Sequence, residues 1–165
     1  MPRLVALVLV AALTFTTGPA IADPLKDAAV AMQANDYETA ARLLRPPAEQ
    51  GVAEAQSMLG AMYNTGNGVS LDHKEAAKWF RLAAQQGEAG GQDGLGLAYE
   101  EGAGVSQDYV RAYMWYALAA ASGDPYADAF AQHRDKIASK MTAAQIAEAR
   151  TLAGKCQASK FKDCD

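Results

Sequence analysis

Residues 59–87 read LGAMYNTGNGVSLDHKEAAKWFRLAAQQG, and residues 95–123 repeat them 36 positions later as LGLAYEEGAGVSQDYVRAYMWYALAAASG. Fourteen identities fall at this single shift, including four glycine pairs and the pair Trp79 and Trp115. Self-similarity at a fixed period of this length is the sequence signature of a repeat architecture, in which each unit buries its apolar face against its copies. The period therefore predicts a stacked array of similar units.

The first half of each unit is predicted to be a helix. We expect one over residues 53–65 and another 36 residues later, because Leu59 and Tyr63 are four apart and so share one face. Gly60 carries no side chain, which lets a neighbouring helix approach closely. Gly66 is placed to end the first of these helices in a left-handed cap.

The second half is predicted to be a turn followed by another helix. Gly68 supplies a second backbone turn, and apolar Val69 is expected to fill the gap between units. Asp72 is a good N-cap, and Glu75 three residues later completes a capping-box pattern. Trp79 recurs in the same phase of the next unit, so we expect this position in the core and not at a sugar-binding surface.

The repeat resembles the Sel1-like repeat, a branch of the tetratricopeptide-like helical repeats. The motif that carries the resemblance is Leu59-Gly60-x-x-Tyr63-x-x-Gly66-x-Gly68-Val69-x-x-Asp72, followed by Ala76-x-x-Trp79-x-x-x-Ala83-Ala84-x-x-Gly87, and its second copy runs from Leu95 to Gly123. The resemblance implies helical hairpins that stack into a superhelix with a concave binding surface.

The flanking segments depart from the pattern. Asp36 lies 36 residues before Asp72, so a shorter first unit precedes the repeats, and Pro46-Pro47 is expected to end its second helix early. Asp124-Pro125 is expected to start a helix over residues 125–139. Thr142 and Gln145 form a capping box for a further helix from Ala143 to Cys156. We therefore predict an all-α, right-handed superhelical array of about four helix-turn-helix hairpins: residues 23–53, 54–89, 90–125 and a divergent capping hairpin with tail, 126–165.

The N-terminus has the pattern of a secretory signal peptide. A basic start at Arg3 precedes an apolar run of ten residues, Leu4 to Leu13, and the segment ends in Ala20-Ile21-Ala22. The alternative is a membrane anchor, but the run is about half of the ~20 residues needed to span a bilayer. We expect cleavage of residues 1–22 and a periplasmic or secreted product that is not embedded in the membrane.

Composition and charge exclude several classes. Of 165 residues 37 are alanine, the best helix former, and half are hydrophobic, which is too many for a disordered chain. The formal net charge of −4 argues against nucleic acid as a partner, because a nucleic-acid binder needs a basic face.

Candidate catalytic and metal-binding groups are few. The only histidines, His73 and His133, stand far apart in sequence, and no spacing of ligand residues suggests a metal site or a cofactor. Cys156 and Cys164 are eight residues apart, and in an exported protein a disulfide is the preferred interpretation, although the sequence leaves open whether it forms.

An enzymatic alternative comes from the family resemblance. Some cysteine-rich Sel1-like proteins are described as penicillin-binding or β-lactamase-like, which would make this chain a cell-wall- or β-lactam-directed hydrolase. The repeats here contain no cysteine. One Ser-x-x-Lys match, Ser159 to Lys162, lies in the C-terminal tail without the companion motifs of serine β-lactamases. We therefore predict no catalytic activity.

The remaining candidate site is the concave groove implied by the resemblance. An acidic stretch beside apolar residues suits a peptide with basic and apolar side chains, and an ordinary solvated helix face is the alternative. A further alternative is a structural accessory that binds peptidoglycan or an envelope complex. Matching the family register, the partner-binding positions are Glu54, Ser57, Asn64, Asp93, Leu97, Glu100 and Glu101. Ala61, Thr65 and Gly90 share this face, and the first unit contributes Leu25, Ala29, Met32 and Gln33.

Overall fold

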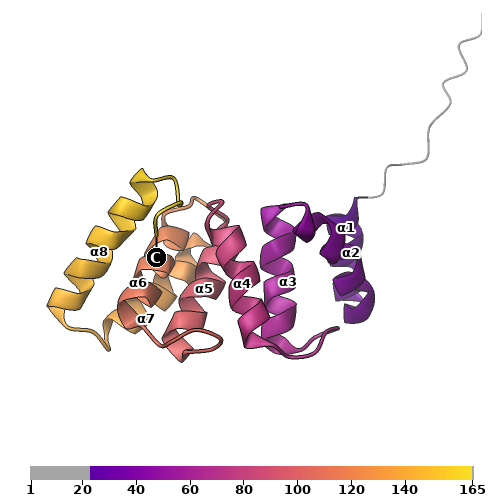
Figure 1. The fold of residues 1–165 in the computed structure, drawn as a ribbon, viewed down its shortest axis with the longest axis horizontal. Helices are drawn as coiled ribbons and strands as arrows, with labels where there is room; N and C mark the ends of the chain where they lie inside the picture. The colour runs from indigo at the N-terminus through magenta and orange to yellow at the C-terminus, as the bar shows by residue number, and fades with distance from the viewer. Residues whose placement is uncertain (1–22, 165) are drawn as a thin grey trace, which may run out of the picture.

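The protein is an all-helical solenoid. The computed structural model describes residues 23–164, and the expected signal peptide, residues 1–22, lies outside them. The described part holds eight helices and no strand, which confirms the predicted fold class. The helices stand side by side along one long axis, with α1 and α2 at one end and α8 at the other (Figure 1). They are α1 (Pro24–Gln33), α2 (Tyr37–Glu49), α3 (Ala53–Thr65), α4 (His73–Ala84), α5 (Ala89–Glu101), α6 (Tyr109–Ala120), α7 (Ala127–Ala138) and α8 (Ala143–Ala158).

Three hairpins stack in chain order, and the last two helices depart from that scheme. The pairs α1–α2, α3–α4 and α5–α6 each pack as a hairpin, and the first helices of the two repeats, α3 and α5, also contact each other. In contrast, α7 and α8 each pack mainly on α6 and not on one another. Their few buried residues explain this, because Ile137 of α7 and Ala149 and Cys156 of α8 all join the core around α6.

The caps of α3, α4 and α8 follow the sequence signals, except for half of one capping box. Gly66 ends α3 in the left-handed conformation, as predicted. The side chain of Asp72 accepts hydrogen bonds from the backbone N–H groups of Lys74 and Glu75, at 2.9 and 3.1 Å. The reciprocal half of this expected capping box is not formed, because the Glu75 carboxylate pairs instead with Lys78, 3.3 Å away. At α8 the Thr142–Gln145 box is complete.

Two predicted helix boundaries are wrong. Helix α2 continues through Pro46 and Pro47 to Glu49, because Leu44 and Ala48 are buried on either side of the prolines and hold the last turn against the core. Helix α7 starts at Ala127 and not at residue 125. The carboxylate of Asp124 accepts a hydrogen bond from the Tyr126 N–H at 2.8 Å, which forms a turn before the helix.

Glycines let aromatic side chains fill the interior of each hairpin. A Cβ at Gly60 would lie 2.8 Å from Phe80 Cδ1, and one at Gly96 would lie 2.7 Å from Tyr116 Cδ1. The two tryptophans are core residues, as predicted, with 7% of Trp79 and none of Trp115 exposed. The glycine positions of the motif therefore match the large side chains packed against them.

The loop inside each repeat presses against the preceding unit. Gly68 has a φ of +70°, and a Cβ there would lie 2.1 Å from the carbonyl oxygen of Tyr37 at the start of α2. Gly104 repeats this contact one period later against His73, at the start of α4. Val69 packs on the core beside it, as predicted. These contacts fix how one unit stacks on the next.

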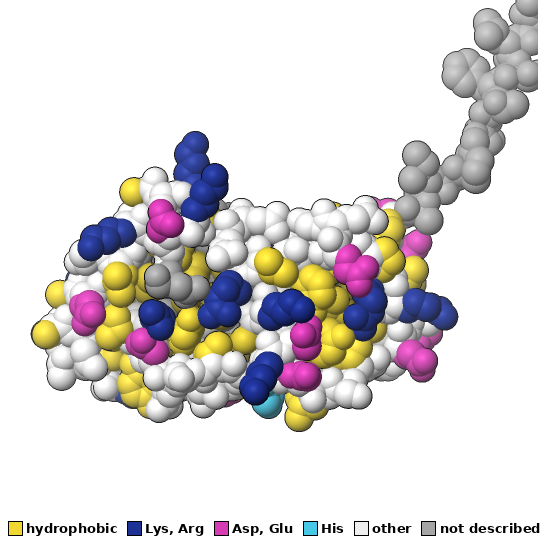
Figure 2. Space-filling view, in the orientation of Figure 1, with side chains coloured by type: hydrophobic (Ala, Val, Ile, Leu, Met, Phe, Trp, Pro, Cys, Tyr) yellow, Lys and Arg dark blue, Asp and Glu magenta, His cyan; other side chains and the backbone are white. Residues whose placement is uncertain are grey.

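Arginine–tyrosine hydrogen bonds add a second tie between successive helices. The guanidinium of Arg45 donates to the Tyr63 hydroxyl at 3.0 Å, and Arg81 repeats this with Tyr99 at 2.9 Å. On the face shown in Figure 2, Lys and Arg side chains alternate with hydrophobic surface along the long axis. Arg45 and Arg81 therefore take part in stacking the units.

A disulfide closes the C-terminal tail. Cys156, at the end of α8, is bonded to Cys164. Within this loop the ring of Phe161 lies against Gly87 in the α4–α5 connection. The tail thus returns from the end of α8 to the end of the first repeat.

We predict that Gly68→Ala destabilises the fold more than Gly51→Ala. Both glycines have positive φ, but a Cβ at Gly51 meets nothing within 4 Å. The Gly51 variant should cost about 1–2 kcal/mol for its left-handed backbone, and the Gly68 variant should cost more because it also pushes the loop off α2. Urea unfolding followed by circular dichroism gives both values. Equal losses would show that the loop contact does not hold the units together.

Removal of the disulfide should loosen the C-terminal end. By the chain-entropy estimate, a loop of this size stabilises the folded state by about 2–3 kcal/mol. We expect Cys156→Ser/Cys164→Ser to unfold at lower urea concentration, with amide exchange accelerated first in α8. The same rate of exchange in both proteins would contradict this role of the bond.

Candidate functional site

A hollow of about 360 Å³ lies between the first helices of the two repeats. Ser57 and Ala61 are spaced along one face of α3, while Asp93 and Leu97 are spaced along one face of α5. Four of the seven predicted partner-binding residues therefore meet here, Ser57, Asn64, Asp93 and Leu97. The full lining is Met32, Ser57, Met58, Ala61, Asn64, Thr65, Phe80, Gly90, Asp93, Gly94 and Leu97.

Small residues on the lining helices give the hollow its depth. A Cβ at Gly94 would lie 2.5 Å from the ring of Phe80, so the glycine lets that ring reach the hollow from α4. Phe80 is 5% exposed and forms part of an apolar surface together with Met32, Met58 and Leu97. The site thus offers apolar contact with polar groups at its edge, which is the usual composition of a binding site.

A second hollow of about 480 Å³ extends the first toward α7. The two share Ser57, Met58 and Gly90, and we call them together the groove. Glu54, predicted to bind a partner, lies in this second part. The other lining residues are Glu88, Asp124, Tyr126 and Phe130, of which Tyr126 is 70% exposed.

Sequence reasoning missed Tyr126 and Phe130. They lie after the second repeat, so no periodicity marks them. The turn at Asp124, which the Asp124-Pro125 pair signals, is what brings both aromatic residues to the end of the groove.

Asp93 meets a partner from outside the repeats. Its carboxylate lies 2.7 Å from Nδ1 of His133 on α7, and only 19% of its side chain is exposed. Burial raises the pKa of the Asp93 carboxyl, while the hydrogen bond and charge of His133 oppose that rise without cancelling it. This carboxylate therefore depends on a nearby positive or hydrogen-bonding group.

Glu100 is held outside the groove. It accepts hydrogen bonds from Lys140 at 2.9 Å and from the Tyr116 hydroxyl at 3.0 Å. Burial pushes the pKa of the Glu100 carboxyl upward, but these hydrogen bonds and the charges of Lys140 and Lys136 outweigh it, so that the pKa is lowered. Glu101 is exposed and does not line the groove either. The structure thus separates the predicted acidic stretch into one groove residue, Asp93, and two residues beyond the groove.

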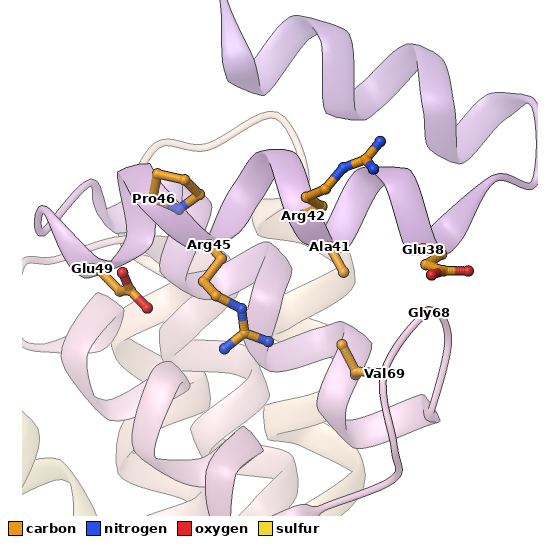
Figure 3. Close-up of a pocket in the computed structure, with 8 residues that line it drawn as sticks. All are labelled: Glu38, Ala41, Arg42, Arg45, Pro46, Glu49, Gly68 and Val69. Carbon is orange, nitrogen blue, oxygen red and sulfur yellow. The ribbon is translucent and has the colours of Figure 1, made fainter.

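Another pocket, of about 290 Å³, lies between α2 and the Gly68–Val69 loop (Figure 3). Arg45 points down toward Val69, while Arg42 points away on the other side of α2. Two arginines and two glutamates line it, so it favours neither anions nor cations, and Arg45 already binds Tyr63. The groove is the stronger candidate because its lining has a single sign of charge.

Groups for catalysis or metal binding are sparse in the described chain. Residues 23–164 contain no cluster of three or more His, Cys, Asp or Glu side chains that could hold a metal ion. His73 is exposed and lies 3.1 Å from the Asn64 side chain. The Ser159 hydroxyl donates to the Cys156 carbonyl oxygen at 2.8 Å, within the disulfide loop.

The Glu100 contacts predict a pH-dependent stability. Because the folded-state pKa is lowered, their stabilisation is present above the unfolded-state pKa and is lost as the pH falls through the folded-state value. Glu100→Gln should cost about 1 kcal/mol near pH 7 and progressively less below about pH 4. Thermal unfolding against pH measures this. Glu101→Gln is the control, and an equal effect of both variants would contradict the assignment.

Comparison with known proteins identifies the two repeats. A family model of the Sel1 repeat matches residues 53–88 and 89–124. The chain is similar to a protective antigen present in uropathogenic Escherichia coli strains that displays an SLR fold, with a TM-score of 0.75 and 28% identity over 84% of this chain and 31% of that one. It is also similar to a Sel1 repeat protein from Oxalobacter formigenes, with a TM-score of 0.60 and 36% identity over 66% of this chain and 43% of that one.

The chain spans less than half the length of either protein. No curated protein sequence matches it significantly. In residues 23–164 no helix is long and apolar enough to cross a membrane. Sel1 repeats generally form non-catalytic scaffolds for protein–protein interaction. The chain therefore contains two Sel1 repeats in succession and has the fold of the Sel1-repeat proteins to which it is similar.

Proposed function

We propose that the protein is an exported scaffold that binds a segment of another protein in the groove and performs no catalysis. The observation that carries this proposal is the groove itself, a continuous surface with apolar residues at its base and carboxylates along it. The presence of two Sel1 repeats supports a binding role.

The lining defines the chemistry of the partner. Met58, Phe80 and Leu97 favour an apolar side chain, since burial of such a group stabilises a complex by about 25 cal/mol per Å². Glu54 and Asp93 favour Lys or Arg. A segment with both apolar and basic side chains, in an extended or helical conformation, fits this arrangement.

Export and the periplasmic or secreted location are part of the same proposal. Residues 1–22 have the composition of a signal peptide. The disulfide between Cys156 and Cys164 is consistent with an oxidising compartment. Fractionation of cells that express the full chain, with N-terminal sequencing of the product, tests it: a mature protein that starts at Asp23 is expected, and an uncleaved cytosolic product would contradict export.

The hydrolase alternative gains no supporting observation. Ser159 lies in the disulfide loop, where its hydroxyl donates a hydrogen bond to the Cys156 carbonyl oxygen and accepts one from the Asp163 N–H. We therefore favour binding in the groove over hydrolysis.

The groove is tested by filling it. Ala61 is exposed on α3 and lines the hollow, so Ala61→Trp should block the site without disturbing the core. The probe is a dye-labelled heptapeptide that alternates Leu and Lys, measured by fluorescence anisotropy. We expect the affinity to fall by about tenfold or more, because the peptide loses apolar contact area in the blocked hollow. Ala144→Trp, on exposed α8 outside the groove, is the matched control, and equal binding by both variants would contradict the proposal.

A further inference from the structure

We propose that Asp93 is the subsite of the groove that accepts a cationic side chain of the ligand, and that His133 is its built-in competitor, which the ligand displaces. The inference rests on the proposed function and deepens it, because it names the carboxylate that selects the ligand's charge and the group that regulates access to it.

Asp93 stands out in the hollow by its charge. It is the single charged side chain among the described residues that line the hollow between α3 and α5. The rest of that lining is apolar or uncharged, so none of it carries a positive charge to balance the carboxylate. A largely buried carboxylate requires a cation or a hydrogen-bond donor to offset its lost hydration. A Lys or Arg side chain of a bound segment meets that need, and so does His133.

In the free protein His133 is the hydrogen-bonding partner of the Asp93 carboxylate. Its Nδ1 lies 2.7 Å from Asp93, its ring lies 5.4 Å from the Tyr116 ring, and half of its side chain remains exposed. Other contacts hold helix α7 in position: Ile137 is fully buried, and Lys140, just after the C-terminal end of α7, binds Glu100. His133 can therefore leave Asp93 while α7 stays in place.

The competition depends on the charge of the imidazole. Histidine is the side chain whose charge changes between pH 5 and 8, and its protonated form holds a carboxylate more strongly than its neutral form. A cationic ligand therefore displaces His133 more easily at pH 8 than at pH 5.5. Protonation of Asp93 at low pH would also weaken binding of a cationic ligand. The variants below separate this effect from the competition by His133. The charged and titratable groups around the contact are Asp93, Glu100 and Glu101 of α5, Tyr116 of α6, Arg134, Asp135 and Lys136 of α7, and Lys140 after it.

The experiment measures binding of the Leu–Lys heptapeptide at pH 5.5 and pH 8 to wild type, His133→Gln and His73→Gln. Glutamine keeps a hydrogen-bond donor but never carries the charge. We expect His133→Gln to bind about threefold to fivefold more tightly than wild type at pH 5.5, the range of a partly exposed ion pair, and nearly equally at pH 8. His73→Gln is the matched control, because His73 faces the neutral Asn64 side chain, and it should behave as wild type.

Asp93→Asn and a peptide that alternates Leu and Glu complete the test. Asp93→Asn should weaken peptide binding at pH 8. In the Asp93→Asn background, His133→Gln should no longer change the affinity at pH 5.5. The acidic peptide should show no gain with His133→Gln. Peptide titration followed by NMR should move the His133 ring signal and leave that of His73.

The outcomes separate the two proposals. If the Leu–Lys peptide binds and is blocked by Ala61→Trp, but wild type and His133→Gln have equal affinities at pH 5.5, the Asp93–His133 inference is overturned and the groove function survives. If no variant binds the peptide at either pH, the proposed ligand class fails and the inference fails with it.

Discussion

Successive units approach each other closely where a loop glycine meets the start of a helix one unit earlier. Gly68 lies on the backbone of Tyr37, and Gly104 lies one period later on the backbone of His73. No residue with a side chain fits there, since a Cβ would overlap a carbonyl oxygen. Because the contact joins backbone to backbone, it sets the distance between successive hairpins. Helix α3 belongs to one hairpin and α5 to the next. The width of the groove between them therefore depends on the distance between these hairpins.

The same constraint explains where the repeat tolerates variation. The loop glycines that contact the preceding unit are the same in both copies, Gly68 and Gly104. Positions that face the groove differ, for example Ala61 and Leu97, which are 36 residues apart. One scaffold therefore presents different side chains on the two sides of the groove, for example Ala61 on α3 and Leu97 on α5. Specificity can change on this surface without loss of the stacking contacts.

Most of the fold follows from the period, whereas only part of the site does. The bounds of α3 and α5 agree with the prediction, because cap residues mark them. The end of α2 was mispredicted, since burial of Ala48 outweighs the local effect of the prolines. In the site, the family register identified Asp93 but not its partner. His133 lies 40 residues from Asp93 outside the repeats, where no periodic signal connects the two.

Helix α7 and the residues that follow it give the carboxylates of the acidic stretch different environments. From sequence, Asp93 and Glu100 are equivalent carboxylates on one helix face. In the fold, Lys140 and Tyr116 hold Glu100 beyond the groove, which makes it a docking point for the C-terminal cap. Asp93 faces the hollow and meets a half-exposed histidine from outside the repeats. The repeat supplies the groove, and the cap decides which of its charges a ligand can reach.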